Sequence, residues 1–294
     1  MTARILQHLA VAILLGSSAS AYAQVLPEAV EAVRIPLATK PTTRPMTVAY
    51  VPDYNRYYIA DGGLGPLSDG LGITMSRSEI HAYSAKGELL QSIKPGLDNR
   101  SIYYNQSTHR LESITYNVSG GAGFTPNTGI YSLELDDQGN LTGNKAELSG
   151  FNAAFGDAAT MPAFDPSGNR YFAKQERSNK VWIVKPEARE KISEITLDLI
   201  AAKVLFDDIS DHYVAHTGLP GEELVLLDID HKAVLVFNLS GKFIGRSALP
   251  ATLKLRAQNH FNGLGYANGL VFVYQEFEGE FGTYYGYRIL GNTN

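Results

Sequence analysis

Short segments rich in β-branched and aromatic residues recur at an almost constant spacing along this chain of 294 residues. Counted at the second residue of each segment, the successive steps are 50, 51, 53 and 50 residues. The segments are Glu79–Tyr83, Gly129–Leu133, Lys180–Val184, Ala233–Phe237 and Thr283–Tyr287. A fixed period of this size, built from strand-like pieces alone, is typical of a β-propeller, in which each repeat folds as one blade of a ring. The chain is therefore predicted to be all-β, with five blades.

Each repeat is predicted to form four strands. The first repeat contains Thr47–Val51, Arg56–Asp61, Ser78–Tyr83 and Glu88–Ile93, which are rich in the residues that favour strands. Gly, Pro, Asn or Asp stands in the breaks between these segments, as turns require. The later repeats keep this order, but the last one ends one strand short, after Tyr284–Leu290.

The N-terminal region contains a candidate for the missing strand. Val33–Leu37 alternates apolar and polar residues and precedes the first repeat. As the outermost strand of the last blade, it would join both chain ends in one sheet and remove an exposed edge. Pro36 is compatible with this place, because an edge strand tolerates the loss of one backbone donor.

The number of blades has an alternative. Residues 188–213 contain two further strand-like pieces, Ile192–Leu199 and Lys203–Asp208. We interpret them as the outer strand of the third blade and the crossing into the fourth. A degenerate sixth blade built from the same pieces is the alternative.

The first 23 residues have the pattern of a signal peptide. Arg4 is followed by an apolar run over Ile5–Leu15 and by small residues that end in Ala21-Tyr22-Ala23. The run is too short to span a bilayer, and the small residues are those of a cleavage site. We therefore predict a signal peptide over residues 1–23, one propeller domain over residues 24–294, and a periplasmic or extracellular location. The chain has no Cys, which excludes a lipoprotein anchor, thiol catalysis and cysteine metal sites.

The charge balance argues against two classes of partner. Arg4 is the only charged residue of the predicted leader, so its removal leaves 24 basic and 30 acidic residues, a net charge of −6. The sequence has no stripe or cluster of Lys and Arg. Nucleic acids and anionic membranes bind through concentrated positive charge, so neither is expected as a partner.

Two sequence patterns resemble a known family. Asp165–Tyr171 follows the pattern Asp-x-x-Gly-Asn-x-Tyr, and Glu79–Leu90 follows x-Ile-x-x-Tyr-x-x-x-Gly-x-x-Leu, which Asp228–Ile244 matches more loosely. They resemble the NHL-repeat propellers and the related SMP-30/gluconolactonase group. The resemblance covers the strand frame of most blades and implies a propeller fold, although NHL rings usually have six blades. The lactonase group also implies a Glu/Asn/Asp set that holds one metal ion at the channel mouth.

Polar residues just before each innermost strand are expected to meet at one end of the central channel. They are Arg44, Asn99, Arg100, Asp157, Thr160, Asp211, His212, Asn259, His260 and Asn262. Oxygen and nitrogen ligands of this kind hold divalent cations such as calcium. The resemblance implies Asp157, Asp208 or Asp211, Asn259 and Asn262 as the metal ligands, with Asp211 as ligand or base. The alternative is that these residues cap strands and bond to turn backbones.

Long insertions are predicted on the same face. Asp61–Arg77 and Asn117–Thr128 join the second and third strands of the first two blades. Long loops on a rigid frame commonly carry binding functions, the alternative being a flexible surface without a ligand.

Three functions are compatible with these features. The first is an exported propeller that binds a protein, glycan or small molecule on its loop-bearing face without catalysis. The second is a metal-dependent hydrolase of the lactonase type, whose cation would polarise a carbonyl group and activate water. The third is a glycan-processing enzyme that uses two carboxylates in the channel.

Overall fold

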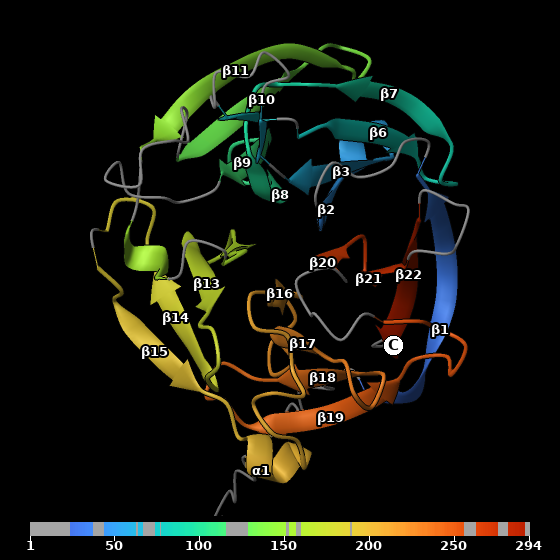
Figure 1. Ribbon diagram of the computed structural model, residues 1–294, viewed down its shortest axis with the longest axis vertical. Helices are drawn as coiled ribbons and strands as arrows, with labels where there is room; N and C mark the ends of the chain where they lie inside the picture. The colour runs from blue at the N-terminus through green and yellow to red at the C-terminus, as the bar shows by residue number, and fades with distance from the viewer. Residues whose placement is uncertain are drawn as a thin grey trace, which may run out of the picture.

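Five blades are arranged in a ring in the computed structural model (Figure 1). The structure describes residues 24–37, 44–62, 64–66, 74–76, 78–115, 129–150, 153–156, 160–188, 190–255, 263–275 and 282–291. Each blade has four strands, and consecutive strands of the chain are antiparallel neighbours within a blade. This arrangement confirms the predicted all-β propeller.

The blades follow the chain, and in each of them the first strand is innermost. Blade one is β2 (Arg44–Val51), β3 (Arg56–Gly62), β6 (Ile80–Ser84) and β7 (Leu89–Ile93). Blade two is β8 (Asn99–Asn105), β9 (Arg110–Thr115), β10 (Ile130–Leu135) and β11 (Leu141–Ser149). Blade three is β12 (Ala163–Asp165), β13 (Arg170–Lys174), β14 (Lys180–Val184) and β15 (Ser193–Thr196). Blade four is β16 (Ala215–His216), β17 (Leu224–Asp228), β18 (Ala233–Phe237) and β19 (Phe243–Ala248). Blade five is β20 (Leu264–Ala267), β21 (Leu270–Gln275), β22 (Thr283–Leu290) and β1 (Val25–Pro36).

Few elements lie outside the blades. A hairpin of β4 (Leu64–Pro66) and β5 (Thr74–Ser76) belongs to the long insertion of blade one. Short helical turns are η1 (Pro52–Tyr54), η3 (Ala153–Phe155) and α1 (Leu199–Ala202). No helix in the described part of the chain is long and apolar enough to cross a membrane.

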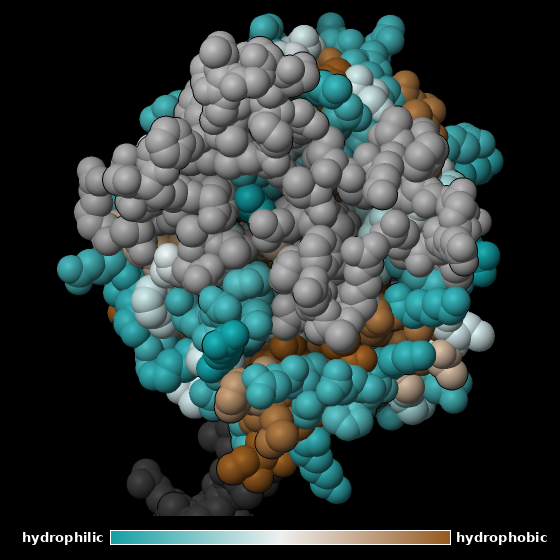
Figure 2. All heavy atoms as spheres, viewed as in Figure 1, coloured by the Kyte–Doolittle hydropathy of each residue, from teal (hydrophilic) through white to brown (hydrophobic). Residues whose placement is uncertain are grey.

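The predicted crossing between blades three and four is also observed. β15 lies within the piece predicted as the outer strand of blade three, and residues 203–208 form turns and no strand. The described residues therefore contain five blades and no sixth sheet of this kind. Figure 2 shows that the crossing forms an apolar protrusion over α1, with exposed side chains of Ile200, Leu205 and Phe206.

The N-terminal strand closes the ring, as predicted. β1 pairs antiparallel with β22 from Val25 opposite Leu290 to Pro36 opposite Thr283, so it is longer than the sequence pattern indicated. It also forms a parallel bridge from Glu28 to Ala248 of β19. This bridge joins blades four and five into one sheet of eight strands.

Consecutive tyrosines of β3 pack against two different blades. Tyr57 and Tyr58 point to opposite faces of the strand, because successive side chains alternate. Tyr57 contacts Phe272 of blade five, with ring centroids 5.2 Å apart. The Tyr58 hydroxyl donates a 2.5 Å hydrogen bond to the carbonyl of Gly139 in blade two. Both tyrosines thus pack between blades, because both faces of the blade are covered by neighbours.

Glycines in two turns allow close contact between blades. A β-carbon on Gly87 of blade one would lie 2.1 Å from the carbonyl oxygen of Arg34 in β1. A β-carbon on Gly241 of blade four would lie 2.0 Å from the carbonyl oxygen of Thr196 in β15. Both glycines have positive φ, +85° and +82°, which only glycine adopts without strain. The glycine of the repeated sequence pattern therefore serves the packing of one blade on the blade before it.

Deletion of residues 24–36 is expected to destabilise the protein strongly. Burial of Ile35 alone contributes about 1.5–3 kcal/mol, and the deletion also exposes the edge of β22. A thermal melt should show a midpoint lower by several degrees, at roughly 2–4 °C for each kcal/mol lost. Ala32→Ser, a substitution at an exposed position of the same strand, is the control and should melt like the wild type. An unchanged midpoint for the deletion would contradict the closure.

Gly241→Ala is expected to cost more stability than Gly143→Ala. Both glycines have positive φ, which costs a residue with a side chain about 1–3 kcal/mol. Only the β-carbon at position 241 meets another blade, since nothing lies within 4 Å of the β-carbon at position 143. Urea denaturation of the two variants measures the difference, and equal losses would show that the contact between blades three and four contributes nothing.

Candidate functional site

Several predicted site residues lie outside the described part of the chain. Asp157, Asn259, His260 and Asn262 belong to this group. Arg44 is the first residue of β2, where the backbone is described and the side chain is not. The predicted metal set therefore stays a prediction. Among the described residues, no three His, Asp or Glu side chains come together as a metal-binding group.

Asn99 and Arg100 lie within β8 and are buried. The Asn99 Oδ1 atom accepts a 2.7 Å hydrogen bond from the Ser113 hydroxyl. The Arg100 guanidinium donates a 2.9 Å hydrogen bond to the Asp98 carboxylate, which is also buried. Both predicted binding residues thus form contacts within blade two and its entry loop.

The described residues of the predicted site in blade four bond to backbone groups. Asp208 Oδ2 accepts from the Leu205 amide at 2.7 Å, and Asp211 Oδ1 accepts from the Arg177 amide at 3.0 Å. The buried His212 accepts from the Met161 amide through its own carbonyl at 2.9 Å. For Asp208 and Asp211, these contacts agree with the alternative that the predicted residues bond to turn backbones.

Asp211 also lies near a buried lysine. Lys174, at the end of β13, is fully buried, and its Nζ atom donates 2.7 Å hydrogen bonds to the carbonyls of Gln175 and Ser178. Burial lowers the pKa of Lys174 to about 8, against the opposing effect of the Asp211 charge. Lys174 and Asp211 therefore hold the same turn, between β13 and β14, from two sides.

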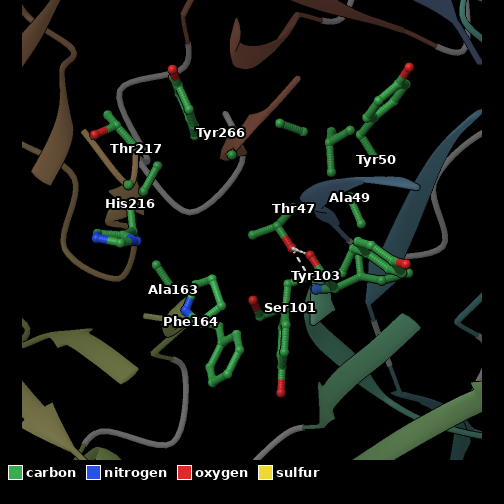
Figure 3. Close-up of a pocket in the computed structure, with 18 of the residues that line it drawn as sticks. Thr47, Ala49, Tyr50, Ser101, Tyr103, Ala163, Phe164, His216, Thr217 and Tyr266 are labelled. Atoms are coloured by element: carbon green, nitrogen blue, oxygen red, sulfur yellow. Dashed lines mark hydrogen bonds between the residues drawn. The ribbon is translucent and has the colours of Figure 1, made fainter. Parts of the chain in front are cut away.

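A cavity of about 610 Å³, which we call the channel cavity, lies at the centre of the ring among the five innermost strands. Figure 3 shows side chains from all five innermost strands around it. The lining continues into the turns that follow these strands, at Pro52, Gln106, Ser167, Gly218 and Asn268. The cavity therefore opens on the face where the innermost strands end, whereas the predicted residues lie where those strands begin.

Hydroxyl side chains join the innermost strands around this cavity. Thr47 of β2 accepts from the Ile102 amide at 2.6 Å and donates to the Ile102 carbonyl at 3.2 Å (Figure 3). Ser101 of β8 donates to the Pro162 carbonyl at 2.7 Å. These hydroxyls connect blade one to two and blade two to three, so they shape the wall of the cavity.

Each innermost strand places one aromatic or imidazole ring at its last or last-but-one residue. These residues, which we call the rim aromatics, are Tyr50, Tyr104, Phe164, His216 and Tyr266, and all five line the cavity. Four of them are partly exposed, and Phe164 is more buried. The ring centroids of Phe164 and Tyr103 lie 4.6 Å apart. The Tyr103 hydroxyl lies 2.7 Å from Glu112 Oε2 and 2.7 Å from the Tyr171 hydroxyl. The position is the same in every blade, so the repeat itself generates the ring of aromatics.

The cavity carries little free charge. Among the described residues that line it, Asp165 is the only Asp, Glu, Lys or Arg, and it accepts hydrogen bonds from Ser167 and from Arg170 Nε at 2.8 Å. Burial alone would raise the pKa of Asp165, but the hydrogen bonds from Ser167 and Arg170 outweigh it and hold that pKa below its usual value. Burial lowers the pKa of His216 although Asp165 is near, so the imidazole is neutral at pH 7. Uncharged aliphatic, aromatic and polar residues therefore make up most of the lining.

None of the rim aromatics is among the residues predicted from the sequence for the site, because those residues come from the segments that precede the innermost strands. Superposing the repeats at the turn that follows each innermost strand would have aligned the five positions. That signal was present in the sequence.

No protein-family model and no curated protein matches this sequence. Solved structures match at low identity. The PQQ-bound aldose sugar dehydrogenase of Streptomyces coelicolor is 11% identical, with 90% of this chain and 99% of that chain covered and a TM-score of 0.37. The β-propeller domain of Cps50 (Swd1) from Myceliophteria thermophila is 10% identical, with 83% and 84% covered and a TM-score of 0.38. A nidogen/laminin complex is 14% identical, with 75% and 84% covered and a TM-score of 0.36. At these values the matches carry no inference about function.

Lys174 is expected to contribute a rise in the free energy of unfolding as the pH increases from about 8 to 10.5. The folded-state pKa of Lys174 lies below its ordinary 10.5, so the unfolded chain binds more protons in this window. The gain amounts to at most about 3 kcal/mol. Urea titrations at several pH values should show a more positive slope in the wild type and in the exposed control Lys185→Met than in Lys174→Met. Equal slopes in Lys174→Met and Lys185→Met would contradict the assignment.

Proposed function

We propose that this chain is an exported β-propeller binding protein that holds an uncharged polar ligand in the channel cavity. The observation that carries the proposal is the ring of rim aromatics, which every blade contributes at the same position. Ligand sites in proteins are typically concave, largely apolar or aromatic, and supplied with a few placed polar groups. The volume of about 610 Å³ lies within the range of such sites.

The lining indicates the charge class of the ligand. No Lys or Arg of the described chain lines the cavity, and the Asp165 carboxylate is already bonded to Arg170. A charged ligand would lose its hydration without gaining an opposite charge, which is costly. A neutral molecule with apolar faces and hydroxyl or amide groups can stack on the rim aromatics and bond to polar groups of the turns. Export rests on the predicted signal peptide over residues 1–23.

A thermal-shift screen with neutral sugars, polyols and nucleosides tests the proposal. A ligand that binds only the folded protein raises the melting midpoint by mass action. Ala163 lines the cavity, so Ala163→Leu should fill part of it and abolish the shift produced by any active compound. Ala248→Leu, an exposed position in β19, is the matched control and should keep the shift. A shift of equal size in both variants would place the ligand elsewhere, and no shift with any compound would contradict the proposal.

A further inference from the structure

A second cavity, of about 560 Å³, lies between blades one and two. Its walls come from the turn after β2, from the turn after β8, and from the sides of β10 and β11. The lining residues used below are Asp53, Tyr104, His109, Arg110, Glu134 and Lys145. We call this cavity the interblade groove.

The interblade groove and the channel cavity share a wall. Tyr104, one of the rim aromatics, lines both. The turn after β2 is also divided between them, since Pro52 lines the channel cavity and Asp53 lines the groove. Both cavities are therefore adjacent, they open on the face where the innermost strands end, and the Tyr104 side chain separates them.

Weak, solvent-exposed contacts hold the Tyr104 hydroxyl, whereas its ring packs against the hydrophobic core. Its hydroxyl lies 3.3 Å from Asp53 Oδ2 and 3.2 Å from His109 Nδ1. The Asp53 and His109 side chains are 64% and 76% exposed. Water competes for these two partners of the hydroxyl, so a ligand can displace them at little cost while the ring stays packed on the core.

The interblade groove offers hydrogen-bonding groups of both signs. Asp53 and Glu134 are balanced by Arg110 and Lys145. Glu134 Oε2 accepts 2.6 Å hydrogen bonds from Thr142 and Asn144, and Lys145 Nζ donates a 2.6 Å hydrogen bond to the Pro95 carbonyl. Like the channel cavity, the groove therefore favours a ligand that is polar and carries no net charge.

We propose that the channel cavity and the interblade groove form one continuous site for a linear neutral oligosaccharide. One sugar ring occupies the channel cavity, the chain crosses Tyr104, and the following rings lie in the groove. This inference rests on the proposed function, because its first unit is the channel ligand. Each cavity alone has the volume of a drug-sized ligand site, so a single compact molecule fills only one of them.

A chain of sugar rings fits these walls better than a peptide. Each ring has an apolar face that can stack on Tyr104 and hydroxyl groups that can bond to carboxylates, amides and the guanidinium group of Arg110. An extended peptide usually pairs its backbone with an open strand edge. Both edges of β10, which lines the groove, are already paired, with β9 and β11, so an added strand could pair only with the outer edge of β11, the outermost strand of blade two.

The test starts from an array of neutral mono- to hexasaccharides and uncharged peptides of matched length. The oligosaccharide that binds most tightly and its monosaccharide unit are then titrated calorimetrically into the wild type. We expect the oligosaccharide to bind about tenfold more tightly than its monosaccharide unit, which corresponds to about 1.4 kcal/mol for the added contacts, stacking on Tyr104 among them. Tyr104→Ala should bind the oligosaccharide about tenfold more weakly than the wild type, whereas Tyr104→Phe should keep most of the affinity.

Two blocking variants separate the two halves of the site. Ala146 is exposed and lines the groove. Ala146→Trp should therefore reduce the affinity for the oligosaccharide to that for its monosaccharide unit, and leave the affinity for the unit unchanged. Ala163→Leu should abolish the binding of both. Ala248→Trp is the control for a bulky substitution on an exposed strand.

Other results would overturn the inference. Binding of peptides alone would overturn it, and so would equal affinities for the oligosaccharide and its monosaccharide unit. The proposal of a ligand in the channel cavity would still stand if Ala163→Leu abolishes binding of the monosaccharide unit. Chain binding that survives Ala163→Leu but not Ala146→Trp would refute the channel proposal as well.

Discussion

Closure of the ring by β1 is the constraint on which the rest of the structure depends. The N-terminal strand pairs with β22 through the backbone inside blade five and bridges to β19 of blade four, so the two ends of the chain lie in one sheet. The channel cavity is lined by strands of all five blades. Its walls therefore keep their positions only while the first and last segments of the chain remain in one sheet, where their polar backbone groups are satisfied and no edge is left open.

Packing between blades then sets how closely the innermost strands approach one another. Tyr57 and Tyr58 cover the two faces of β3, and Gly87 lets a turn of blade one rest on the backbone of β1. Near the axis, the Thr47 and Ser101 hydroxyls bond to the backbone of the next blade. Because these hydroxyls are occupied by the frame, they shape the cavity, and ligand contacts fall to the rim aromatics and the turns.

The chemistry of the channel end follows from the repeat. One aromatic or imidazole ring stands at the end of every innermost strand, so a ring of five forms without long-range design of single residues. The departure from symmetry is at blade two, where Tyr104 also borders the interblade groove. The proposed ligand specificity therefore depends on Tyr104, which is both one of the five rim aromatics and part of the interblade groove between blades one and two.

The sequence by itself determined the propeller, the five blades and the closing role of the segment around Ile35, because strand pattern and period are local properties. It also contained the aromatic repeat from Tyr50 to Tyr266, which becomes visible once the turns are aligned. Only the tertiary structure decided that the channel cavity lies at the end where the innermost strands finish, and that Asp208 and Asp211 bond to turn backbones. Which side chains share a cavity, and which are already bonded, depends on distances between blades, and such distances arise from packing between residues far apart in the chain.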